Sequence, residues 1–362
     1  MTDAKPPRRP RRRARRAVFG VLALATLAAA AHGLAWHWAT GAIAVGMSDW
    51  VTQRRAEGWS IDHGPPTRGG WPFAAHLAMD DVRIEAPARA GQPGLAHQAG
   101  RVVLQIAPPQ PDRLRILFEG PQRLRLGGAE IPFAAERFVL ALPLAAGPSH
   151  AAVEFDTAGL EMLLPAGPVQ VRAARIVLVK GAAAPRGAEA EPALGITLQA
   201  AGVVPPPSAL TAALGREVEQ LSAEGVLAGT PPLPGPPAVM AAGWRDGGGV
   251  LELPALALRW GPLSGDARLT LALDAALQPQ GRGTLRLAGA PAALDALAGA
   301  GLIDAGAARA GQGVVALLAR TPPEGGPPRV ELPMVLANGT LSVARVPLLR
   351  LVPIAWPATR GW

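Results

Sequence analysis

The residues able to do chemistry are few and lie far apart in the sequence. Asp62 is followed directly by His63, and Asp80 and Asp81 stand together at the start of an apolar stretch. Two carboxylates held close together can act as a general acid and a general base, and His63, His76 and Asp80 are residue types that bind zinc. Acidic residues beside turns are common, however, and no two histidines form a His-x-x-x-His pair. We therefore predict no catalytic residue, no metal site and no cofactor.

Sequence motifs of known enzyme classes are also missing. No serine lies in Gly-x-Ser-x-Gly or in Ser-x-x-Lys, and the chain has neither a P-loop nor Gly-x-Gly-x-x-Gly. The chain has no cysteine, which excludes disulfides and thiolate metal sites. These absences predict that the protein is not an enzyme.

The positive charge of the chain is concentrated at its N-terminus. The formal net charge is +8, and residues 1–16 hold eight basic residues and one acidic residue, a net of +7. The remaining chain has 27 basic and 26 acidic residues. Binding of a polyanion needs many clustered basic side chains on the folded surface, so we predict no nucleic-acid partner.

Residues 17–45 are apolar and contain no charged side chain. Because a bilayer core needs about 20 such residues, we predict a transmembrane anchor over 17–45, behind a basic tail over 1–16. The positive-inside rule places that tail in the cytoplasm and the body in the periplasm, across a bacterial inner membrane that the chain crosses once. Trp36, Trp38 and Trp50 would form an aromatic belt at the far interface. The alternative is a signal peptide cleaved near the small residues at 29–31.

The first half of the body, residues 48–230, is predicted to be rich in strands. Apolar and polar residues alternate in segments such as Leu124-Arg125-Leu126, which is typical of half-buried antiparallel strands. The arginines opposite the leucines predict a solvated face, and a row that binds anions is the alternative. A change of period near Ser208 predicts an amphipathic helix over 208–222, with Ser208 as its N-cap.

A segment dense in turn formers and aromatic residues precedes these strands. Its centre is Gly69, Gly70, Trp71, Pro72 and Phe73. Glycine and proline favour a sharp turn, and large aromatic rings favour burial. We predict a structural corner at the start of the sheet with Trp71 buried, so that Trp71→Ala costs roughly 3–5 kcal/mol. A binding surface is the alternative.

A proline-rich loop at 230–237 is followed by the second half of the body, residues 238–355. This half is again predicted to contain strands followed by a helix. Leucine spacing predicts a helix over 291–303, and a third apolar group near Val314 extends beyond it. Asn338-Gly339 predicts a tight hairpin between residues 334 and 343, and 356–362 form a tail. The fold class is mainly β with a few amphipathic helices (α+β): an N-terminal transmembrane helix followed by a curled, largely antiparallel sheet.

The sheet has more leucine-rich area than the two clear helices can cover. A curled sheet with inward leucines leaves a trough that either packs shut or admits an apolar guest. We predict an apolar groove lined by Leu253, Leu258, Leu271, Leu273, Leu285, Leu287 and Val335.

Several short motifs carry a resemblance to a known family. They are the basic N-terminus, the anchor, the corner at 69–73, Trp260-Gly261-Pro262-Leu263, Asp274, Gln278-Pro279-x-Gly281 and Asn338-Gly339-Thr340-Leu341. Over residues 17–355 the chain resembles a domain-of-unknown-function family of Gram-negative, inner-membrane-anchored periplasmic proteins. The resemblance implies no catalytic residue. The layout is also similar, at the level of fold, to larger anchored envelope proteins whose β-rich bodies form apolar grooves implicated in lipid handling.

These observations favour a non-enzymatic, membrane-anchored periplasmic protein that binds a lipid or acyl chain in an apolar groove for envelope maintenance. Its predicted partners are the inner membrane and either a lipid or an envelope protein. One alternative is a structural or interaction module of an envelope assembly. The other is a periplasmic hydrolase that uses Asp62, Asp80 or Asp81.

Overall fold

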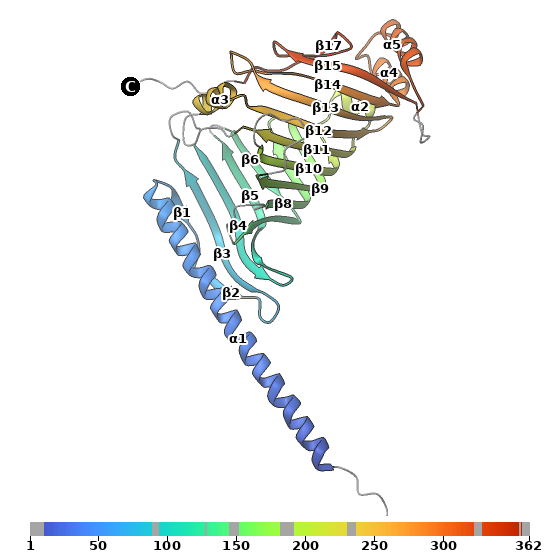
Figure 1. The fold of residues 1–362 in the computed structure, drawn as a ribbon. Helices are drawn as coiled ribbons and strands as arrows, with labels where there is room; N and C mark the ends of the chain where they lie inside the picture. The colour runs from blue at the N-terminus through green and yellow to red at the C-terminus, as the bar shows by residue number, and fades with distance from the viewer. Residues whose placement is uncertain are drawn as a thin grey trace, which may run out of the picture.

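The computed structural model describes residues 11–88, 94–126, 129–144, 152–181, 192–229, 237–321, 328–354 and 356. Over these residues the chain forms a long N-terminal helix, α1 (Arg11–Ala56), and one sheet of 17 strands with short helices at its ends. Figure 1 shows α1 running along the first strands of the sheet and continuing well beyond them. The predicted fold class is confirmed: an apolar N-terminal helix precedes a large antiparallel sheet.

The helix α1 has two halves with different surroundings. Every residue from Val18 to Ala31 is exposed, and this half projects away from the body (Figure 1). From Trp36 to Val51, one face of the helix packs on the sheet, where Thr40, Ile43 and Val51 are buried. The apolar segment 17–45 therefore has two different environments: residues 18–31 are exposed, and residues 36–45 contact the body instead of extending the exposed part.

The exposed half of α1 is the part suited to a bilayer. The helical segment Val18–Ala56 is long enough and apolar enough to cross a membrane, so the chain has a candidate single-pass anchor. Trp36 and Trp38 lie just beyond the exposed apolar half, as an aromatic belt would. Trp50 lies about 18 Å further along the helix axis and is half-buried, which places it beside the sheet and outside such a belt.

The strands follow one another as a long antiparallel meander. Their bounds are β1 (Ser60–Asp62), β2 (Thr67–Gly69), β3 (Ala75–Ala86), β4 (Leu95–Ala107), β5 (Gln110–Leu126), β6 (Ala129–Ala134), β7 (Arg137–Pro143), β8 (Ala152–Leu164), β9 (Gly167–Lys180), β10 (Pro192–Val204), β11 (Val218–Ala228), β12 (Val250–Trp260), β13 (Leu263–Leu273), β14 (Pro279–Ala288), β15 (Arg329–Ala337), β16 (Thr340–Val343) and β17 (Val346–Arg350). From β8 onward each strand pairs with the next in the chain. The long strand β5 pairs with β4 on one side and with both β6 and β7 on the other.

The sheet is strongly twisted along its length. The strands β3 to β5 run close to the direction of α1, whereas β12 to β15 cross that direction steeply (Figure 1). The short strands β1 and β2 both pair with β3 and form one edge. A twist of this kind is expected because each strand rotates by roughly 20–25° relative to its neighbour.

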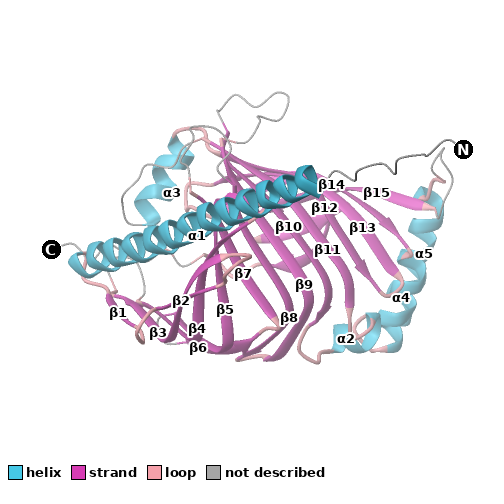
Figure 2. Cartoon of the chain, turned by 90° about the horizontal axis from the view of Figure 1, so that it is seen from below, coloured by secondary structure: helices cyan, strands magenta, loops and turns pink. Residues whose placement is uncertain are grey.

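Four short helices lie at the ends of the strands. They are α2 (Ala209–Leu214), α3 (Pro237–Asp246), α4 (Ala290–Gly299) and α5 (Ala305–Leu318). Seen from below in Figure 2, α2, α4 and α5 gather at one end of the strands and α3 lies at the other. The predicted helix over 291–303 is found as α4, which ends at Gly299. The apolar group near Val314, expected to extend that helix, lies on the separate helix α5, and α3 was not predicted.

The predicted helix over 208–222 is wrong beyond Leu214. Ser208 caps α2 as expected, since its side-chain oxygen accepts a hydrogen bond from the backbone N–H of Thr211 at 3.2 Å. Gly215, at φ 112°, then ends the helix, and Val218–Ala228 forms β11. Pairing of β11 with strands on both sides outweighs the local helical spacing.

The predicted hairpin near the C-terminus is confirmed. Asn338 and Gly339 both have positive φ, 51° and 69°, as a type I′ turn requires. Ala337 and Thr340 pair directly on either side of the turn.

Candidate functional site

A continuous row of apolar side chains crosses the sheet on the face that α1 covers. Each member lies directly opposite the next across a strand pair, and cross-strand partners share one face. The members of this apolar row are Leu77, Leu104, Ile116, Leu140, Phe155, Ile176, Leu198, Ala223, Leu256, Ala267, Leu285 and Leu332. No polar residue interrupts the row over twelve successive positions.

The cover over this row is uneven. Leu77 and Leu104 are buried because Ile43 of α1 packs on them with Trp36 and Met47 beside it. The other ten members, from Ile116 in β5 to Leu332 in β15, are only half-buried. The main helix contacts with the sheet lie at β1 and β3 for α1, at β13 for α3 and α4, and at β15 for α5. No helix of the described ranges therefore makes an extensive contact with the apolar face between β5 and β12.

Six of the seven predicted groove residues lie on this face. Leu258 and Leu287 share one partner, Gly265 of β13. On the same surface, Leu253 pairs with Leu269, and Leu271 pairs with Leu251. All six leucines are half-buried and none is fully buried, which differs from the interlocked core that would exclude a guest. A bulge between Leu253 and Leu256 lets leucines an odd number of residues apart face the same way.

Val335 does not belong to the groove. It pairs with Arg282 and Ser342 and is 49% exposed, so it lies on the polar face. Its neighbours Met334 and Leu336 occupy the apolar face and are buried. A shift of one residue in register reverses the face of a strand residue, which is the reason for the error.

Glycines opposite leucines shape the second half of the apolar face. Gly281 pairs with Leu271 and Gly283 with Leu269. A Cβ atom at either glycine would lie 2.0 Å from the carbonyl oxygen of the neighbouring strand, so no larger residue fits. The leucine side chains lie over these glycines, with Cδ atoms 2.9 Å from the same positions, which leaves the face shallow and lined by leucine methyl groups.

The opposite face of the sheet carries paired charges. Glu154 binds Arg113 and also Arg175, the latter at 2.7 Å, and Asp156 binds Arg137. Burial alone would raise the pKa of Glu154, but the hydrogen bonds and charges of its two arginine partners outweigh it and lower that pKa. Arg113, Arg137 and Arg175 thus have carboxylate partners, and this favours the predicted solvated face over an anion-binding row.

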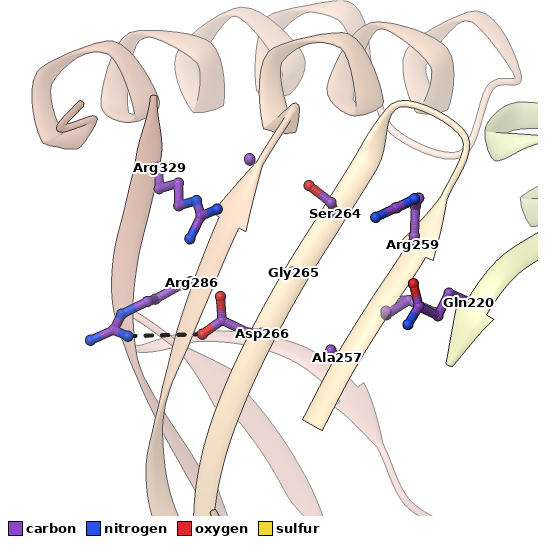
Figure 3. Close-up of a pocket in the computed structure, with 10 residues that line it drawn as sticks. Gln220, Ala257, Arg259, Ser264, Gly265, Asp266, Arg286 and Arg329 are labelled. Atoms are coloured by element: carbon purple, nitrogen blue, oxygen red, sulfur yellow. Dashed lines mark ion pairs between the residues drawn. The ribbon is translucent and has the colours of Figure 1, made fainter. Parts of the chain in front are cut away.

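A shallow polar hollow lies further along the same face (Figure 3). Arg286 extends toward Asp266 there and also binds Glu331, at 4.0 Å and 2.9 Å. The hydrogen bond that Arg286 donates to the Glu331 carboxylate raises the pKa of Arg286. Two carboxylates already neutralise this arginine, so the hollow has a weaker claim to a ligand than the apolar face.

One polar pair interrupts the apolar face beside α1. His97 Nε2 lies 2.9 Å from Gln122 Oε1, and the His97 ring stacks near Phe133 and meets the edge of Phe118. The Gln122 side chain is buried, and its Nε2 has no hydrogen-bond partner among the described residues. Burial lowers the pKa of His97, and the hydrogen bond to Gln122 offsets part of that effect. No local sequence pattern indicates this pair, because its two members are 25 residues apart.

We expect acid to destabilise the body through His97. Because its pKa is lowered in the folded chain, the unfolded chain binds the proton first, and stability falls as pH drops below about 6.5. His97→Phe removes this titration and keeps the aromatic packing, so its unfolding free energy should fall less between pH 7 and 5.5. Urea unfolding of both chains at several pH values measures the difference, and parallel pH profiles would contradict the assignment.

The comparisons with known proteins identify the family. The family described as "Uncharacterized protein conserved in bacteria (DUF2125)" matches residues 36–351. The chain belongs to this family. The match begins at Trp36, close to the point where α1 begins to pack on the sheet, and covers nearly the whole body. No curated protein and no solved structure matches the chain.

The motifs that suggested a family have structural roles in this DUF2125 chain. Trp260 Nε1 donates to the carbonyl oxygen of Gly215 at 2.7 Å, and the backbone N–H of Gly261 donates to the carboxylate of Glu219. Asp274 Oδ1 accepts hydrogen bonds from the backbone N–H groups of Ala276 and Gln278, both at 2.8 Å. These contacts hold turns and helix ends in place and bring no reactive groups together.

The carboxylates and histidines considered for chemistry also remain dispersed. Asp80 is exposed and lies 3.7 Å from Arg101, and Asp62 and Asp81 are exposed. His63 Nδ1 lies 2.8 Å from the carbonyl oxygen of Gly64. Within the described ranges, no three His, Cys, Asp or Glu side chains stand close enough to hold a metal ion. That the protein is not an enzyme stays a prediction.

The predicted corner at 69–73 exists, but its rings are not buried. The backbone N–H groups of Phe73 and Ala74 donate to the carbonyl oxygen of Gly70 at 3.0 and 2.8 Å, which closes the turn. Trp71 is 50% exposed and Phe73 83% exposed, so the predicted burial of Trp71 is wrong. The corner lies at the end of the sheet beside α1, where only one side of the Trp71 ring finds a neighbour. Trp71→Ala should therefore cost less than a buried aromatic would.

Proposed function

We propose that this DUF2125 protein is anchored in the bacterial inner membrane and binds a lipid acyl chain on the apolar face of its sheet. The observation that carries the proposal is the apolar row. Ten of its twelve members are only half-buried, and the face on which they lie has no extensive helix cover between β5 and β12 within the described residues. A partly exposed apolar surface that crosses this many strands is unusual in a soluble body, and this supports a binding site there.

A linear acyl chain suits the geometry of this surface. The row runs across the strands, which are spaced about 4.8 Å apart, so its ten half-buried members span far more than the length of one chain. Neighbouring rows contain leucine opposite glycine, as in Leu269 with Gly283 and Leu271 with Gly281. Such pairs leave the surface apolar without raised side chains that would block a chain lying along it.

The placement in the membrane rests on α1. Residues 18–31 are apolar and exposed along the whole surface of the helix, and eight basic residues precede the apolar segment. In our proposal the basic tail stays in the cytoplasm and the body lies in the periplasm, in accordance with the positive-inside rule. The apolar face then stands beside a bilayer that can supply lipids.

Co-purification of lipid tests the proposal. A chain that starts at His32 lacks the exposed apolar segment but keeps the helix residues that pack on the sheet. Purified without detergent, it should carry phospholipid in native mass spectra, removable by organic extraction. Lipid binding would be contradicted if the native mass spectrum showed only the mass of the protein while a melting curve showed that the body is folded.

A second candidate function is an interaction module of an envelope assembly. The exposed leucines of α5 favour it, because Leu317 is 87% exposed and Leu318 is 47% exposed on one short helix. This candidate takes precedence if the purified body carries no lipid.

A further inference from the structure

Four large exposed side chains lie on or beside the middle of α1. Trp38 is 75% exposed on the helix itself, and Arg68 of β2 is exposed and lines the same hollow along α1 as Trp38. On the other side of the helix, the corner presents Trp71 and Phe73, which are 50% and 83% exposed. Exposed tryptophan, phenylalanine and arginine beside an apolar helix are residue types found where a bilayer meets water.

Two hydrogen bonds fix the height of the corner on α1. His32 Nε2 lies 2.7 Å from the carbonyl oxygen of Pro72, and Trp36 Nε1 donates to the carbonyl oxygen of Ala74 at 2.9 Å. The Trp71 ring lies against the helix, with its centroid 4.8 Å from that of His32. The corner is thus joined to the stretch of α1 that directly follows the exposed apolar half.

This height matches the thickness of a membrane. With a rise of 1.5 Å per residue, His32 lies about 21 Å and Trp36 about 27 Å beyond Val18 along the helix axis. The hydrocarbon core of a bilayer is about 30 Å thick. When the hydrocarbon core begins at Val18, Trp71 and Phe73 lie within about 10 Å of its far boundary.

We infer that the corner at 69–73 is a membrane-contact element, in which Phe73 and Trp71 insert into the outer boundary of the bilayer while Arg68 meets lipid phosphates. Phe73 is 83% exposed, whereas a purely structural corner would be expected to bury its largest rings. The inference depends on the proposed insertion of α1 and not on lipid binding by the apolar face.

The contact would place the start of the apolar row next to the membrane. Leu77, its first member, is only four residues after Phe73, or about 13 Å of extended chain. The strand β3 therefore begins at the bilayer surface and leads away from it, along the buried part of the apolar face. This arrangement gives an acyl chain a short path between the bilayer and the sheet.

The absence of cysteine makes a direct test simple. Phe73→Cys, introduced in the full chain and labelled with an environment-sensitive fluorophore, is reconstituted in phospholipid nanodiscs with or without nitroxide-labelled lipid. Leu27→Cys, in the exposed apolar helix, is the positive control. Leu317→Cys is the matched negative control, because Leu317 is 87% exposed, as apolar as Phe73, and lies on the distant helix α5.

The three probes separate the outcomes. We expect the Phe73 probe to lose most of its fluorescence when the nitroxides are near the lipid headgroups. The Leu27 probe should lose most of its fluorescence when the nitroxides are deep in the acyl region. The Leu317 probe should keep its signal in both cases. A Phe73 probe that behaves like the Leu317 probe, while Leu27 is quenched, would overturn the inference and favour a protein partner at the corner. If the Leu27 probe also keeps its signal, the membrane anchor itself is wrong and the inference is overturned with it.

Discussion

A chain that lacks residues 1–31 should fold, whereas one that lacks residues 1–47 should lose on the order of 5 kcal/mol of stability. The shorter deletion removes only the N-terminal tail and the exposed half of α1. The longer one also removes Trp36, Ile43 and Met47, which pack over Leu77 and Leu104. A loss of that size is comparable to the whole stability of many domains, so the second chain should be largely unfolded or aggregated.

Thermal melts of the two chains measure this effect. A point variant gives the matched control: Ile43→Ala should cost roughly 2–4 kcal/mol because Ile43 is buried, and Val45→Ala should cost close to nothing because Val45 is 62% exposed. Equal melting temperatures for the two deletions would show that α1 is not part of the body's core.

The second large effect concerns lipid occupancy of the apolar face. Leu271→Arg should lower the amount of co-purified lipid about tenfold or more, since arginine in an apolar medium costs roughly 2.5–3.5 kcal/mol on the insertion scale. Ala272→Arg is the control, because Ala272 is adjacent in the chain but pairs with Gln280 on the opposite face. Both variants should keep the parent melting curve.

Native mass spectra of the chain starting at His32 provide the comparison. Lipid occupancy should remain at the parent level for Ala272→Arg and fall only for Leu271→Arg. An equal fall in both variants would indicate a general loss of structure, and no fall in either would place the lipid elsewhere. Leu271→Asn, which adds no charge, should give an intermediate occupancy if contact with the apolar face is responsible.

The sequence predicted the parts of the fold that depend on local alternation. Segments such as Ile196-Thr197-Leu198 alternate as half-buried strands do, and the structure pairs Leu198 with Ile176 and Ala223 on one face. Six of the seven leucine-rich groove positions share one face for the same reason, and their role as a groove stays a prediction. The hairpin at Asn338 was correct because its turn requires two residues with positive φ.

The parts that the sequence could not predict depend on long-range contacts. Val335 was assigned to the wrong face because register is set by pairing with β14 and β16. Residues 36–45 look like a continuation of the anchor, since the apolar residues that span lipid and those that pack on a sheet are of the same types. The exposure of Trp71 depends on the absence of a second layer at the end of the sheet, which no local pattern records.

A photoreactive amino acid on the apolar face gives the most direct test of the central claim. Benzoylphenylalanine replaces Leu198 in the apolar row or, as the matched control, Gln199, which is exposed on the opposite face. After irradiation of cells that express the full chain, the account predicts a lipid adduct on the protein labelled at Leu198 and none on the protein labelled at Gln199. No lipid adduct at Leu198, or equal adducts at both positions, would contradict it.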